Sequence, residues 1–130
     1  MLQQTQVKTV IPYFKNFVKK IPDLITLSAT NNRRVLKLWE GLGYYRRARN
    51  LHKTAKILIK KYNGKLPKKF EEIKKLPGIG EYTANALLAL VYNHPRIPYD
   101  GNIKRVFSRL FNTDLEKNKK KRLLLFRNNK

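Results

Sequence analysis

Leu76-Pro77-Gly78-Ile79-Gly80 opens directly into Glu81 to Val91, a nearly uncharged stretch that reads EYTANALLALV. Two glycines around one apolar residue let a backbone approach a ligand closely. A helix that begins at such a turn presents unpaired N–H groups and the positive end of its dipole, which suits a phosphate. An ordinary helix-to-helix connection is the alternative. The short amphipathic segment before the turn, with Phe70 and Ile73, favours a helix-hairpin-helix.

Elsewhere, apolar residues recur at spacings of three and four, which is typical of helices and not of strands. We therefore expect an all-α fold in which residues 81–91 form the central buried helix and Trp39 and Tyr45 lie in the core. The other helices are expected over residues 7–18, between Pro22 and Ala29, after a cap at Asn31 or Asn32, from about Tyr44 to Tyr62, and over 103–111. Asn63-Gly64 should end the longest of them.

Composition sets further limits: the 130 residues include 30 Lys plus Arg, 8 Asp plus Glu and no cysteine, with a formal net charge of +22. This length suits one domain, expected over residues 1–113, followed by a basic and poorly ordered tail over 114–130. Without cysteine the chain supplies no disulfide, thiolate-bound zinc, iron-sulfur cluster or cysteine nucleophile. It has no apolar run of membrane-spanning length and no signal-peptide pattern, so we expect a cytoplasmic protein.

The positive charge indicates a polyanionic partner, most commonly nucleic acid, because Lys and Arg that neutralise phosphates release counterions. A genome rich in A and T would also raise Lys, which outnumbers Arg by 20 to 10. Charge alone leaves both explanations open. Together with the charge, the hairpin is best explained as a grip on a DNA backbone that does not read sequence.

Asp100 and the stretch 41–49 (GLGYYRRAR) could carry chemistry. An Asp just before a helix most simply caps it, and a carboxylate held there could also stabilise a cation. Aromatic residues on a glycine-rich turn beside three arginines suit a protein that unstacks bases, and we assign Tyr44 to that role. Alternatively, the arginines form a solvated helix face. His52 and His94 lack partners at metal-ligand spacing, so we expect hydrogen-bonded or surface residues and no metal site.

Three segments together resemble the A/G-specific adenine DNA glycosylases of the helix-hairpin-helix superfamily. They are MLQQTQV at 1–7, WEGLGYY at 39–45 continuing through RNLH at 49–52, and LPGIG at 76–80 followed by Asp100-Gly101-Asn102. The resemblance covers about residues 1–112 and implies the six-helix lobe of that fold. It implies a monomeric enzyme of base-excision repair, in bacterial cytoplasm at the nucleoid. Its implied partner is duplex DNA, from which it removes adenine mispaired with 8-oxoguanine or guanine.

The resemblance also implies roles for single residues. Asp100, with Asn102 beside it, matches the carboxylate that stabilises the oxocarbenium-like sugar. Tyr82 stands where lyases of the superfamily carry the Lys that forms an imine, so a monofunctional glycosylase is implied. Leu2 falls in the base pocket. The positions implied to contact DNA are Gln3, Gln4, Thr5, Tyr44, Arg46, Leu76, Gly78, Ile79 and Gly80.

The sequence departs from the family pattern in its cysteines and at its ends. The family's [4Fe-4S] cluster has no cysteine ligands here, so we expect no cofactor in this chain. The family's general acid is a Glu two residues before the position of Met1, so we expect little excision by this chain alone. Two alternatives stay open: a noncatalytic helix-hairpin-helix DNA-binding module, and an endonuclease III-like lyase, which Tyr82 and the missing cysteines disfavour.

Overall fold

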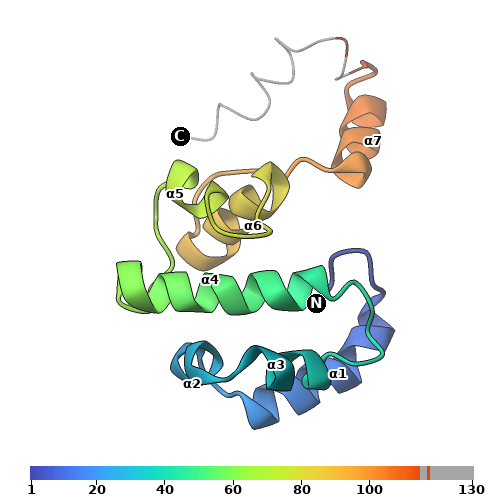
Figure 1. Ribbon diagram of the computed structural model, residues 1–130. Coiled ribbons are helices and arrows are strands. Elements are labelled where there is room, and N and C mark those ends of the chain that lie inside the picture. Colours follow the sequence, from blue (N-terminus) through green and yellow to red (C-terminus); the bar gives the residue numbers. More distant parts are fainter. Residues whose placement is uncertain (115–116, 118–130) are drawn as a thin grey trace. The chain divides into compact units, whose positions relative to one another are not determined.

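The computed structural model describes residues 1–114 and 117, and the regular structure within this part is entirely helical (Figure 1). The helices are α1 (Val7–Lys20), α2 (Leu24–Ala29), α3 (Asn32–Leu38), α4 (Arg46–Tyr62), α5 (Phe70–Lys74), α6 (Glu81–Tyr92) and α7 (Gly101–Leu110). The all-α prediction is confirmed, with seven helices in this part where six were expected. Most of the tail expected over 114–130 lies outside the described residues.

The chain forms two compact units. The first comprises residues 1–67 and 76–78, and the second comprises residues 68–75 and those from 79 onward. Helices α1 to α4 therefore belong to the first unit, and α5 to α7 belong to the second. None of the described helices combines the length and the apolar character needed to cross a bilayer.

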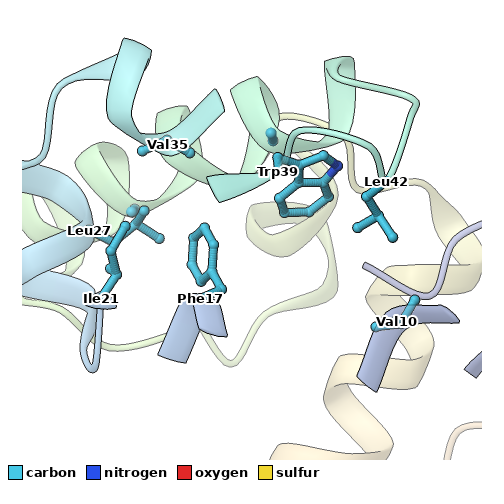
Figure 2. Close-up of a cluster of buried hydrophobic side chains, with 9 residues drawn as sticks. Val10, Phe17, Ile21, Leu27, Val35, Trp39 and Leu42 are labelled. Atoms are coloured by element: carbon cyan, nitrogen blue, oxygen red, sulfur yellow. The ribbon is translucent and has the colours of Figure 1, made fainter. Parts of the chain in front are cut away.

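The core of the first unit is built around Trp39, whose side chain is 1% exposed. Its ring meets that of Phe17 edge-on, with centroids 6.1 Å apart, and α2 and α3 pack against α4 (Figure 2). The predicted core position of Trp39 is confirmed. The buried members of this cluster are Val10, Phe17, Ile21, Leu27, Val35, Trp39, Leu42, Ala48 and Ala55.

Local signals define the helix ends of this unit. The Asp23 side chain accepts from the Thr26 N–H at 2.7 Å, and the Asn31 side chain accepts from the Arg34 N–H at 2.8 Å, so Asn31 is the cap of α3. Helix α4 ends at Asn63, which has a left-handed φ of 49°, as predicted. It begins at Arg46, later than expected, because Tyr44 also has a left-handed φ of 49°.

In the second unit, α5 packs against α6. The extra helix α5 arises because the segment around Phe70 and Ile73 closes into a helical turn that buries Ile73 completely. The prediction that α6 is buried as a whole is wrong. Its residue Leu88 is buried, but Leu90 is 85% exposed. Apolar composition therefore overstated the burial of α6, because it does not reveal how much of a helix its neighbours cover.

Candidate nucleic-acid interface

The hairpin turn is fixed on α4 by both packing and hydrogen bonding. Leu76 is buried at 4% exposure, and the Thr54 Oγ1 donates to the Pro77 carbonyl at 3.2 Å. Gly78 has φ +76°, and a Cβ added there would lie 2.6 Å from the Asn50 Nδ2. Only glycine fits this position without a shift, so the turn brings its backbone as close to α4 as the chain allows.

The second half of the turn leads into the N-terminus of α6. Gly80 is the N-cap residue with an extended backbone, and no side chain caps the helix there. A Cβ added at Gly80 would meet open space, so the backbone is accessible at this point. Ile79 is half-buried and Tyr82, in the first turn of α6, is 47% exposed. The free N–H groups of an uncapped helix N-terminus next to open space can donate hydrogen bonds to a phosphate oxygen.

Asp100 is the N-cap of α7, which confirms the predicted capping role. Its Oδ1 accepts from the Asn102 N–H at 3.0 Å and from the Ile103 N–H at 2.8 Å. Among the described residues, no partner binds its other oxygen, Oδ2. The Asn102 side chain is exposed and accepts from the Arg105 Nη2 at 2.9 Å. The cap therefore fixes the carboxylate through one oxygen and leaves the second available.

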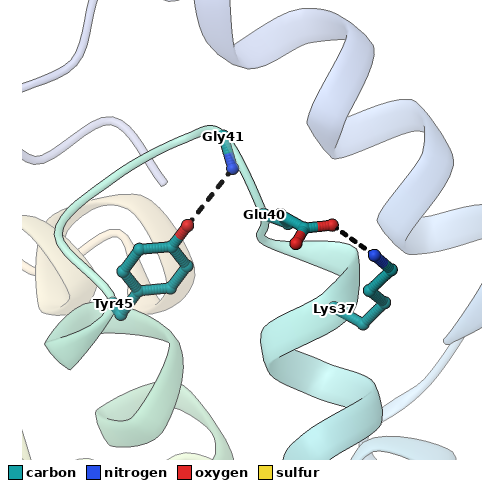
Figure 3. Close-up of polar contacts among 4 residues, drawn as sticks. All are labelled: Lys37, Glu40, Gly41 and Tyr45. Carbon is teal, nitrogen blue, oxygen red and sulfur yellow. Dashed lines mark hydrogen bonds and ion pairs between the residues drawn. The ribbon is translucent and has the colours of Figure 1, made fainter.

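The two tyrosines of the glycine-rich loop after α3 are both exposed, which differs from the prediction for Tyr45 but not for Tyr44. The Tyr45 hydroxyl turns back and accepts from the Gly41 N–H at 3.3 Å, next to the Lys37–Glu40 ion pair (Figure 3). Tyr45 is 39% exposed, so its predicted core position is wrong. The physical reason is this contact, which holds the ring over the loop. Tyr44 is 61% exposed, so its side chain is accessible, as its assigned role requires.

The N-terminal segment lies in the same unit as this loop. Leu2 is 57% exposed, and the Thr5 N–H bonds the Leu2 carbonyl at 3.4 Å, which closes a turn. Gln4, within this turn, is exposed and has φ 59°. The Thr5 Oγ1 is buried with no hydrogen-bond partner in the described part of the chain. Gln3, like Gln4, is exposed.

Arg47 is the residue of this region that sequence reasoning missed. Its guanidinium donates to the carbonyls of Met1, Gln3, Leu42 and Gly43. It therefore joins the N-terminal turn to the glycine-rich loop. The sequence places it in a run of arginines that could equally be a solvated helix face, whereas Arg47 is half-buried and its neighbour Arg46 is exposed.

The assignment of Leu2 to a base pocket stays a prediction. Two surface depressions of the first unit are lined by residues from α2, α3 and the loop regions beside them, including Arg34 and Tyr45, and neither includes Leu2 or Gln3. Leu2 and Gln3 lie in the first unit, whereas Tyr82 and Asp100 lie in the second.

Most positive charge cannot be paired within the chain, because 30 Lys plus Arg stand against 8 Asp plus Glu. Lys37 and Glu40 form an ion pair within the described part. The excess positive charge suits an anionic partner. No group of three or more His, Cys, Asp or Glu suited to a metal occurs among the described residues. A chain without cysteine also does not fit an iron-sulfur cluster ligated by thiolates.

His52 is a buried member of α4 with 3% exposure. Burial, with the nearby charge of Lys56, lowers the pKa of His52 below its usual 6.5, against a smaller opposing effect of its hydrogen bond with the Thr30 backbone. This bond agrees with the expectation of a hydrogen-bonded helix residue. Its Nε2 has no partner within the described residues.

Solved structures with this fold define the class of protein. The chain superposes on endonuclease III in a trapped covalent intermediate with DNA, with a TM-score of 0.73 and 30% identity, covering 81% of this chain and 50% of that one. It also superposes on a thermostable thymine-DNA glycosylase, with a TM-score of 0.75 and 27% identity, covering 82% of this chain and 50% of that one. The fold and the hairpin are those of a helix-hairpin-helix DNA glycosylase.

The chain belongs to the HhH-GPD superfamily of base excision DNA repair proteins, whose family model matches residues 1–129. It is 54% identical over 115 residues to the adenine DNA glycosylase of Buchnera aphidicola subsp. Baizongia pistaciae, covering 88% of this chain and 33% of that protein. It is 40% identical over 111 residues to the human adenine DNA glycosylase, covering 85% of this chain and 20% of that protein. The chain thus spans a third or less of the length of these relatives.

Proposed function

We propose that this chain is part of an adenine DNA glycosylase that removes adenine mispaired with 8-oxoguanine or guanine from duplex DNA. The similarity to adenine DNA glycosylases over 88% of the chain carries the proposal. The position of the Asp100 carboxylate also supports the proposal, because it leaves an oxygen that can face a developing positive charge. Its carboxylate is fixed through Oδ1 and has a second oxygen that no described residue binds.

In this proposal the chain binds the phosphate backbone of the duplex and separates the stacked bases at the mispair. The turn of Gly78 and Gly80 and the N-terminus of α6 bind phosphate without reading sequence. Gln4 and Tyr44 are both exposed, so both side chains are accessible to a base stack. Extruding adenine costs least where pairing is already weak, which favours mispairs.

The chemical step is hydrolysis of the N-glycosidic bond. As the purine leaves, positive charge develops on the sugar, and an ionised Asp100 next to C1′ stabilises it. Asn102 and Tyr82 complete the surroundings of the sugar. Tyr82 has no amine with which to form an imine, so the proposed enzyme releases adenine and leaves the strand intact.

The Asp100→Asn variant tests the catalytic assignment. Asn caps helices about as well as Asp, so the fold is expected to persist while the negative charge is lost. In the longer glycosylase of which the chain is proposed to be part, we expect the rate of adenine release from an A:8-oxoguanine duplex to fall by about 100-fold or more, with duplex affinity unchanged. The matched control is Asp23→Asn, which changes a cap of the same kind on α2 and should leave release unchanged. Release by Asp100→Asn at the original rate would contradict the assignment.

A noncatalytic DNA-binding module is a second candidate, and one observation favours it. The net charge of +22 accounts for binding to a duplex without any catalytic step. A module would bind duplex DNA in a salt-dependent manner and release no adenine, with or without Asp100→Asn. Covalent trapping of the chain on abasic DNA by borohydride would instead indicate a lyase.

A further inference from the structure

Arg47 brings together four backbone carbonyls from two segments far apart in the sequence. It is the second residue of α4. Its Nη1 donates to the carbonyls of Met1 and Gln3, and its Nη2 donates to those of Leu42 at 3.5 Å and Gly43 at 3.3 Å. The planar fork of a guanidinium suits this arrangement, because its two terminal nitrogens point in fixed and different directions.

Two of these carbonyls occupy special positions in the chain. The Gln3 carbonyl belongs to the peptide plane that precedes Gln4, and the Gly43 carbonyl belongs to the plane that precedes Tyr44. Gln4 has φ 59° and Tyr44 has φ 49°, a conformation that residues with side chains adopt only with support from their surroundings. Since φ is the rotation between that preceding plane and the residue, a bond to the carbonyl helps to fix it.

The guanidinium is itself held against the core. It lies over the Trp39 ring at 5.7 Å from the centroid and over the Tyr44 ring at 5.2 Å. The Trp39 Nε1 donates to the same Gly43 carbonyl at 3.1 Å. The Arg47 Nε is buried without a hydrogen-bond partner among the described residues. A lysine could keep the charge but not the fork, because its ammonium is a single point on a flexible stem.

We propose that Arg47 is a positioning residue that fixes the peptide planes before Gln4 and Tyr44 and so presents these two side chains as a pair. The contacts of Arg47 support the fixing of the two peptide planes. The insertion of the Gln4 and Tyr44 side chains into a base stack rests on the proposed function.

Backbone dynamics of the labelled chain test the fixing of the planes directly. In Arg47→Lys we expect the heteronuclear NOE at the amides of Gln4 and Tyr44 to fall together, while that of Ala55 in α4 stays unchanged. The control is Arg33→Lys, which makes the same exchange at an exposed position of α3 and should change none of them. Unchanged values at both Gln4 and Tyr44 would overturn the proposal, as would a uniform fall across the first unit.

A second measurement needs no variant and so does not depend on Arg47→Lys folding. In the unsubstituted protein, the four hydrogen bonds should slow rotation of the Arg47 guanidinium, so that its Nη protons give separate resonances. Those of the exposed Arg33 should be averaged. Averaged Arg47 resonances would overturn the proposal whatever the variant does.

Duplex binding then tests the use of the pair. We expect Arg47→Lys to lower the affinity ratio between an A:8-oxoguanine duplex and a matched A:T duplex by about tenfold, and Arg33→Lys to leave it unchanged. A ratio that stays the same although Gln4 and Tyr44 have loosened would overturn their role in recognition and leave the positioning by Arg47 in place. A fall without any loosening would overturn the positioning.

Discussion

Gly78 combines a positive φ with a close approach of its backbone to the Asn50 side chain, so a substitution there is expected to be costly. In Gly78→Ala the new Cβ meets Asn50 at 2.6 Å and the backbone must hold φ +76°. We expect a destabilisation of about 1–3 kcal/mol, measured by chemical unfolding. Gly101→Ala is the control, because open space surrounds Gly101 and alanine suits a helix. Equal stability of Gly78→Ala and the original chain would contradict the close approach.

His52 should make stability depend on pH. Its folded pKa lies below the unfolded value of 6.5, so between these two values the unfolded chain binds the proton that the folded chain rejects. Stability should therefore fall as pH drops below about 6.5 and level off below the folded pKa. Melting temperatures of the original chain and His52→Gln test this, with exposed His94→Gln as the control. An undiminished slope from pH 7 to 5 in His52→Gln would count against it.

The sequence predicts residues with local contacts better than residues whose partners are distant in the chain. Asn31, Asp100 and the glycines of the hairpin could be predicted because their roles depend on neighbours in the chain. Arg47 could not, because its partners Met1 and Gln3 are 46 and 44 residues away. Tyr45 was assigned to the core on helical spacing, but the chain is not yet helical at that position, and the ring contacts Gly41 instead.

At the scale of elements, periodicity predicted which segments are helices but not how much of each helix is covered. In α1 the apolar residues Val7, Ile11, Phe14 and Val18 are exposed, whereas Val10 and Phe17 are buried. In α7 no residue is buried, although its apolar residues have helical spacing. The spacing of apolar residues reports a preference for burial, whereas burial itself depends on the elements that pack against the helix.

Two phenylalanines three residues apart in α1 test the difference between the buried and the exposed side of this helix. Phe17 is 6% exposed and contacts Trp39, whereas Phe14 is 55% exposed. We expect Phe17→Ala to cost about 3–5 kcal/mol, because it leaves a cavity in the core. Phe14→Ala, the matched change on the exposed side, should cost far less. Chemical unfolding of the two variants compares them, and similar losses would contradict the described face of α1.

At the scale of the whole molecule, the dominant feature is the net charge of +22. Because 22 positive charges have no acidic counterpart in the chain, it should bind any duplex with an affinity that falls steeply as salt rises. Such binding carries no information about the lesion. Preference for a mispair must come from the few residues that meet the bases, for which Gln4 and Tyr44 are the candidates.

Recognition of the mispair by this chain can therefore be measured as the ratio of its affinities for two duplexes that differ only in one base pair. Dissociation constants are measured at one fixed salt concentration for an A:8-oxoguanine duplex and for the same duplex with A:T. We expect tighter binding to the lesion duplex by about tenfold or more, and loss of this preference in Gln4→Ala with general binding retained. Equal affinity for the two duplexes would contradict recognition of the mispair by this chain.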